Sequence, residues 1–125
     1  MMSRPKGKIS RFEDLDVWKN AKAVVIKVYK VSGIGDFARD FELRDQMRRA
    51  AVFIMSNIAE GFERQSDKEF SGFLYMAKGS AGELRSQLYI AQELGYLSLK
   101  GKQSLQQDLE VISKQLSGLI RHLNS

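Results

Sequence analysis

The amino-acid sequence predicts an all-α fold, an antiparallel up-down-up-down four-helix bundle. The chain has 125 residues, a length typical of one domain, and its single proline, Pro5, stands near the start, so no strong helix breaker follows it. Breaks rich in glycine, serine or aspartate at 32–36, 61–66 and 95–101 divide the rest into four segments of helical length. Apolar residues recur in these segments with helical spacing, and long helices joined by short links are typical of such bundles.

The predicted helix over 13–31 is the most apolar of the four. One of its stripes consists of Trp18, Ala21, Val25 and Val28, and a second consists of Val17, Val24 and Val31. A bundle helix needs to bury only one stripe about 100° wide, so the second stripe either broadens the core face or is covered by another subunit. We favour the subunit, because large apolar patches seldom stay open to water. We therefore expect a homo-oligomer whose interface includes Val17, Val24 and Val31.

The other three segments carry narrower apolar stripes. The second helix, over 37–60, buries the stripe that starts at Leu43 and Met47. The third, over 67–94, has a heptad seam in which every position is apolar. The capping box at 66–69 and Gly95 mark its two ends. The fourth, over 102–125, repeats this seam. No stretch alternates with a period of two for long enough to predict a strand.

The basic residues are concentrated at the N-terminus. The chain has 20 Lys and Arg and 15 Asp and Glu, a net charge of +5. Residues 1–11 are a predicted flexible arm without acids, and residues 12–125, the predicted bundle domain, hold 16 bases and 15 acids. Such an arm is able to hold phosphates, or it serves solubility alone. The four bases of the arm are Arg4, Lys6, Lys8 and Arg11.

The composition excludes several kinds of site. The chain has no cysteine and one histidine, His122, which excludes disulfides, thiolate nucleophiles, zinc ribbons and multi-histidine metal sites. We therefore expect neither a metal nor a cofactor. No apolar run approaches the ~20 residues of a membrane span, and no charged-then-apolar leader opens the chain. We expect a cytoplasmic protein without a membrane partner.

Polar residues interrupt the stripes beside the seams of the second and third helices. Asn57 and Glu60 lie on the second helix, and Ser80 and Glu83 on the third. A buried carboxylate needs a cation or several donors, so these side chains either lie on solvated faces or form a structural polar network. A hydrolase that uses both glutamates is the weaker hypothesis, and we expect no enzyme. The small residues at 79–82 predict that a neighbouring backbone approaches closely there.

Several motifs follow one another in a fixed order: FEDLDVW at 12–18, QMRRAA at 46–51, NIAEG at 57–61 and LGYL at 94–97. Together they resemble the small bacterial four-helix-bundle proteins named after open reading frames in intervening sequences of 23S ribosomal RNA genes. The resemblance covers roughly residues 12–123. It implies an antiparallel four-helix bundle that assembles as a homopentamer. Phe53 and Met55 depart from the family pattern, which usually has Ser and Pro there, so the second helix should be straighter and bulkier.

Binding to RNA is the function usually suggested for the family that the chain resembles. We therefore expect a non-catalytic homo-oligomer, pentameric by the resemblance, that binds RNA or another nucleic acid through its basic arm. The sequence contains no RNA-recognition signature of interleaved aromatic and basic residues. The alternative is an oligomeric scaffold or adaptor for a protein partner. Second contacts with phosphates are expected from Arg39, Arg44, Arg48, Arg49 and Arg64.

Overall fold

The computed structural model describes residues 9–125, and these form helices and connections without a strand. The predicted all-α fold is thus confirmed. Two short elements, η1 and α2, were not predicted. None of the described helices combines the length and the apolar character that crossing a membrane requires. In chain order the elements are η1 (Phe12–Asp14), α1 (Asp16–Val31), α2 (Gly35–Arg39), α3 (Phe41–Phe62), α4 (Asp67–Glu93) and α5 (Leu99–Asn124).

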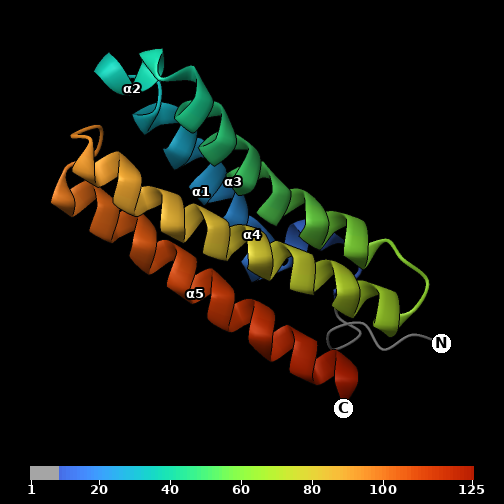
Figure 1. Ribbon diagram of the computed structural model, residues 1–125. Helices are drawn as coiled ribbons and strands as arrows, with labels where there is room; N and C mark the ends of the chain where they lie inside the picture. The colour runs from blue at the N-terminus through green and yellow to red at the C-terminus, as the bar shows by residue number, and fades with distance from the viewer. Residues whose placement is uncertain (1–8) are drawn as a thin grey trace.

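The four long helices surround one core. Helix α1 packs against α3 and α5, and α4 packs against the same two helices on the other side. Figure 1 shows the chain reversing direction between α3 and α4 and again between α4 and α5. The bundle therefore has four lateral faces, named here α1–α3, α3–α4, α4–α5 and α5–α1. The α3–α4 face lies opposite the α5–α1 face, because the helices follow each other around the core in this order.

The ends of the helices follow the expected capping chemistry. Ser66 Oγ accepts a hydrogen bond from the Glu69 amide at 3.1 Å, as the capping box predicted. Gly95 follows α4 with a φ of 80°, in the left-handed region that suits glycine after a helix. Asp40 caps α3 by accepting from the Leu43 amide, and it also accepts from the hydroxyl of Tyr96 at 2.9 Å. One carboxylate thus joins the start of α3 to the turn between α4 and α5.

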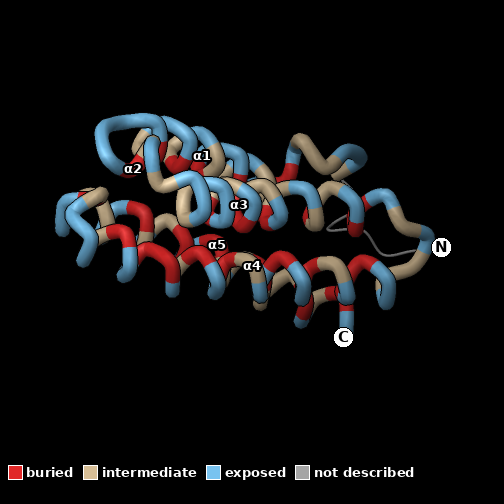
Figure 2. The backbone as a smooth tube through the Cα atoms, turned by 45° about the horizontal axis from the view of Figure 1, so that its top comes forward, coloured by how far each residue is buried: buried red, intermediate tan, exposed pale blue. Residues whose placement is uncertain are grey.

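The core includes most of the apolar seams that the sequence predicted for α3, α4 and α5. In Figure 2 the buried positions recur along these helices and face the middle of the bundle. Full burial of one such side chain is worth about 1.5–3 kcal/mol relative to leaving it exposed. The seam of α4 is completely buried: Phe70, Leu74, Ala77, Ala81, Leu84, Leu88 and Ala91.

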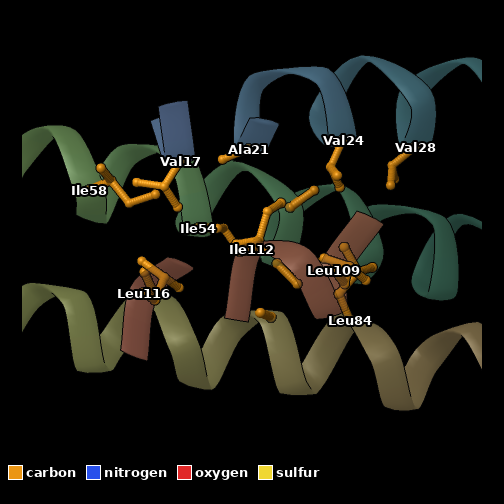
Figure 3. Packing of buried hydrophobic residues seen from close by; sticks show 14 of the residues in the cluster. Val17, Ala21, Val24, Val28, Ile54, Ile58, Leu84, Leu109, Ile112 and Leu116 are labelled. Carbon is orange, nitrogen blue, oxygen red and sulfur yellow. The ribbon is translucent and has the colours of Figure 1, made fainter. Parts of the chain in front are cut away.

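The valine stripe that we expected at a subunit interface lies inside the bundle instead. Val17 and Val24 are 5% and 1% exposed, and Val31 packs partly buried against the same cluster. Figure 3 shows the first two directed from α1 into the core. The expected interface is therefore wrong at Val17 and Val24, which the core of the same chain already covers. The reason is the rotation of α1: its buried stripe is Val17, Ala21, Val24 and Val28, which joins residues that we had divided between two stripes.

Polar side chains bridge α1 and α5 at the edge of the core. Lys27 Nζ lies 2.6 Å from Asp108 Oδ2 and 2.9 Å from Ser104 Oγ. Seven residues before Lys27 on α1, Asn20 donates a hydrogen bond to the side chain of Gln115 at 3.0 Å. These contacts join two helices that stand at opposite ends of the sequence.

Candidate nucleic-acid interface

Most of the predicted basic arm lies beyond the part of the chain that the structure describes. Arg11 is the exception. Its guanidinium is exposed and lies 3.8 Å from a carboxylate oxygen of both Glu13 and Asp14, which partly neutralise its charge. The three predicted ligands outside the described residues are Arg4, Lys6 and Lys8.

Three of the five arginines predicted as second contacts are next to an acid. A carboxylate that already accepts from the guanidinium competes with an incoming phosphate for the same donors. In one pair, the hydrogen bond from Arg44 holds the pKa of the Asp45 carboxyl below its ordinary value, so that this acid stays charged. The pairs are Arg39 with Asp36, Arg44 with Asp45 at 2.9 Å, and Arg64 with Glu60 at 3.1 Å.

Arg48 and Arg49 line a shallow hollow of about 350 Å³ on the α1–α3 face. Arg48 Nε donates to the hydroxyl of the buried Ser32 at 2.8 Å, and its guanidinium lies 4.5 Å from the ring centroid of Tyr29. These contacts hold the end of α1 against α3, so Arg48 has a structural role. Arg49 is exposed and forms no ion pair with any residue in 9–125, but Asp45 lines the same hollow.

The four predicted network residues do not form a network between α3 and α4. Three of them have a partner one turn away on the same helix, so these bonds do not join α3 to α4. Ser80 is half-buried on α4. The bonds run from Asn57 to the Phe53 carbonyl at 2.9 Å, from Arg64 to Glu60 at 3.1 Å, and from Gln87 to Glu83 at 3.5 Å.

The packing of α3 on α4 keeps Glu60 and Glu83 apart. A Cβ added at the buried Gly61 would lie only 2.7 Å from the Cβ of Phe73, so the two helices meet closely there. Glu83 follows Phe73 by ten residues, which is about 15 Å along a helix at about 1.5 Å per residue. Paired carboxylates in glycoside hydrolysis stand roughly 5–9.5 Å apart. The hydrolase hypothesis therefore lacks its shared pocket.

The close approach that we predicted at 79–82 occurs at Gly61 instead. A Cβ built at Gly79 or Gly82 meets no other atom within 4 Å, because both glycines are on the outer surface of α4. The expectation is therefore wrong at Gly79 and Gly82, whereas Ala81 between them is buried on the seam. Glycine permits close packing only where it lies on the seam between two helices, and these two do not.

A basic hollow that we did not predict lies on the α4–α5 face. Its volume is about 460 Å³, and its lining contains three cations, two hydroxyl groups and no acid. Within residues 9–125 none of the three cations forms an ion pair, and all three are exposed. The lining residues are Lys78 from α4 and Ser113, Lys114, Ser117 and Arg121 from α5.

Helical spacing explains how α5 supplies four of these side chains. Lys114, Ser117 and Arg121 recur at intervals of three and four residues, which places them on one face of a helix. The guanidinium of Arg121 lies back over Gly118, 3.8 Å from where a Cβ would stand. This spacing was visible in the sequence, whereas Lys78 becomes part of the hollow only because α4 packs beside α5.

Two other faces of the bundle expose apolar side chains. On α1, an open hollow of about 520 Å³ is lined by Trp18, Ala23 and Ile26 among charged residues, and Val111 of α5 lines an adjoining hollow. On the α3–α4 face, Phe53 and Met76 are about half exposed. These two apolar regions are on opposite sides of the bundle.

The fold and these surfaces place the chain in the class of small helical-bundle proteins. More narrowly, it belongs to the family of 23S rRNA-intervening sequence proteins, whose family model matches residues 13–118. The resemblance seen in the sequence is thereby confirmed. A solved structure with the same fold, a protein of unknown function from the S23 ribosomal protein family of Bacteroides thetaiotaomicron VPI-5482, has a TM-score of 0.78. The two chains are 22% identical, over 84% of this chain and 95% of the other. Among curated proteins none matches.

Proposed function

We propose that this protein is a non-catalytic homo-oligomer that binds RNA through basic residues on the surface of its bundle. The observation that carries this proposal is the hollow between α4 and α5, where Lys78, Lys114 and Arg121 meet two serine hydroxyls and no acid. Cations and hydroxyl groups are the side chains that contact phosphate oxygens in nucleic-acid complexes. The family name, which refers to 23S rRNA, and the S23 ribosomal family of the similar structure support the same class of ligand.

The two different apolar faces support head-to-tail assembly of the subunits, and the closed ring follows the family resemblance. A cyclic head-to-tail oligomer needs two different complementary patches on each subunit. In the proposed ring, the α5–α1 face with Ile26 and Val111 covers the α3–α4 face with Phe53 and Met76 of the next copy. The number of five subunits comes from the family resemblance. The basic hollows stay uncovered and repeat around the ring, so that weak phosphate contacts add through avidity.

The geometry also supports a role without catalysis. Glu60 and Glu83 are separated along the helices, and Glu60 pairs with Arg64. A carboxylate that is exposed and paired has no environment that prepares it for acid–base work, which depends on burial and on neighbouring charges. The surface is suited to holding a polyanion.

Binding of RNA by a charge-matched pair of variants tests the proposal. In the first variant Lys78, Lys114 and Arg121 are changed to glutamine. In the control, three exposed lysines outside the hollow are changed to glutamine, which lowers the net charge equally. The control residues are Lys19, Lys30 and Lys100.

We expect the hollow variant to bind a labelled RNA at least about tenfold more weakly, as measured by fluorescence anisotropy, while the control stays close to the wild type. Each phosphate contact contributes about 0.7 to the slope of log affinity against log salt for single strands, so the slope should fall by about 2 in the hollow variant. Equal losses in both variants would assign binding to overall charge. An absence of RNA binding at low salt would refute the proposal and leave the protein-adaptor alternative.

A further inference from the structure

We infer that the α4–α5 face binds single-stranded RNA in preference to duplex, with one base stacked on the ring of Tyr75 while the adjoining phosphates occupy the basic hollow. This inference rests on the proposed RNA-binding function and adds to it a strand requirement and a base contact. It gives the face two kinds of contact, cationic and aromatic.

Tyr75 stands beside the hollow and is open to a ligand. It lies three residues before Lys78 on α4, so the two side chains are neighbours on one helix face. The residue is 58% exposed. Among residues 9–125 no ring, cation or hydrogen-bond partner contacts it. The aromatic ring is therefore available next to three cations.

Four other aromatic rings at the surface differ from Tyr75, because a Lys or Arg side chain already lies over each of them. A cation over a ring occupies the face on which a nucleobase would stack. Phe53 has no such cover, but it lies on the α3–α4 face, away from the hollow. The covered rings are Tyr29 under Arg48, Phe41 under Arg44, Phe73 under Arg64 and Tyr89 under Lys102.

The α4–α5 face continues beyond the hollow with the same composition. Tyr75, Lys78, Arg85 and Tyr89 follow one side of α4 at intervals of three, seven and four residues. Tyr89 lies under the ammonium of Lys102, 3.7 Å from the ring centroid. The stripe is about 21 Å long at about 1.5 Å per residue. Single-stranded sites of about 4–16 nucleotides combine cations with aromatic platforms in this way.

One acid on this face, Glu110, limits the path that the phosphates of a bound RNA can take. Glu110 of α5 is exposed one turn before Lys114, and it lines a separate hollow with glutamines that include Gln103 and Gln106. Its charge repels phosphate, so the phosphate path runs from Lys114 toward Arg121 and crosses to Lys78. Tyr75 stands at this end of the face, where a base that leaves the path meets an exposed ring.

Stacking explains the preference for single strands. In a duplex the bases are already stacked and paired, so a surface tyrosine meets only backbone. In a single strand any base offers a π-face, and stacking on a protein ring is therefore tolerant of sequence. The face should bind single strands of different sequence with similar affinity and should bind duplex RNA through its phosphates alone.

The test compares Tyr75→Ala with Tyr75→Phe, which keeps the ring, and with Phe41→Ala, which removes an exposed ring far from the hollow. Each full-length protein is titrated with a labelled single-stranded RNA and with a duplex of the same length. We expect Tyr75→Ala to bind the single strand about tenfold more weakly and the duplex less than about twofold more weakly. Tyr75→Phe and Phe41→Ala should bind both like the wild type.

Two results separate this inference from the proposed function. If Tyr75→Ala binds the single strand like the wild type while the Lys78, Lys114 and Arg121 variant is weakened, the inference fails and the proposed function stands. The inference also fails if Tyr75→Ala weakens single strand and duplex equally. If the wild type binds neither RNA, the proposed function fails, and the inference fails with it. Circular dichroism checks that each variant is folded, which we expect because Tyr75 is exposed.

Discussion

Replacing Gly61 with alanine tests how closely α3 and α4 approach each other. The added Cβ would lie 2.7 Å from the Cβ of Phe73 and 3.0 Å from Cδ1 of Phe70. Because the Cβ of Phe73 is attached directly to the backbone, no rotation of a side chain relieves the overlap. The two helices must separate or tilt, which in a packed core costs about 1–3 kcal/mol. The short distance places Gly61→Ala in the upper part of that range.

Two opposing effects determine the size of the change. Alanine is favoured over glycine inside a helix by about 1 kcal/mol, whereas the overlap costs about 2–3 kcal/mol. The free energy of unfolding should therefore fall by about 1–2 kcal/mol. Gly79→Ala is the matched control, because a Cβ there meets nothing within 4 Å. This control keeps only the helix-propensity gain, so its free energy of unfolding should rise by up to about 1 kcal/mol.

Urea denaturation followed by far-UV circular dichroism measures both variants. The protein concentration is held constant, because association adds to apparent stability. The midpoints of Gly61→Ala and Gly79→Ala should move in opposite directions from the wild type, with unchanged slopes. A Gly61→Ala protein as stable as the wild type would show that α3 and α4 have room for a methyl group and would refute the close packing.

Three further predictions concern the corrected interface and the Tyr96–Asp40 contact. Val24→Asp places an unpaired carboxylate in the core and should destabilise the bundle by about 3 kcal/mol or more, measured by urea denaturation. Ile26→Asp, on the surface, should leave the helical content intact and reduce the mass in light scattering to that of a smaller assembly; an unchanged mass would contradict the proposed ring. The hydrogen bond to Asp40 raises the pKa of Tyr96 above 10.0, so its contribution to stability is complete below 10.0 and is lost as the pH rises through the folded-state pKa. Tyr96→Phe should remove that alkaline loss from urea midpoints, and a loss as large as in the wild type would count against the contact.

The helices and most of the core could be predicted because each apolar pattern allows only one face of its helix to be buried. The seam of α4 repeats at intervals of four and three residues from Phe70 to Ala91, and every member is buried. Helix α1 is apolar around more of its circumference, so its sequence allows several rotations. Trp18, which we placed in one of the two stripes, is half-buried, and its ring packs against Phe12 with 5.3 Å between the ring centroids. Phe12 belongs to η1, an element that the sequence pattern did not predict.

The position of each glycine relative to the apolar seam of its own helix could have been predicted from the sequence. Gly61 follows Ile54 by seven residues and Ile58 by three, which places it on the buried seam of α3. Gly79 and Gly82 are out of phase with Ala77, Ala81 and Leu84. Comparing each glycine with its own seam therefore distinguishes a packing contact from an exposed position. Which partner helix lies opposite still depends on tertiary structure.

The candidate site was predictable only in part, because helical spacing groups residues within one helix but does not show which helices pack together. Lys114, Ser117 and Arg121 share a face of one helix, and helical spacing alone is enough to group them. Lys78 stands 36 residues earlier in the chain and joins the group through the packing of α4 on α5. Three of the arginines that we favoured pair with acids one to four residues away, such as Asp36 beside Arg39, and these pairs could have been predicted from helical spacing.

The polar bridges between α1 and α5 have a consequence for the order in which the chain folds. Lys27 and Asp108 are separated by 81 positions, and Asn20 and Gln115 by 95. Helices α3, α4 and α5 are joined by short turns, so they can form hairpins at a small entropic cost of loop closure. Helix α1 reaches α3 just as locally, through the short connection at 32–40, so only its contacts with α5 bring distant parts of the chain together. These polar bridges therefore close the largest loop of the fold, and they should form after the local helix pairs.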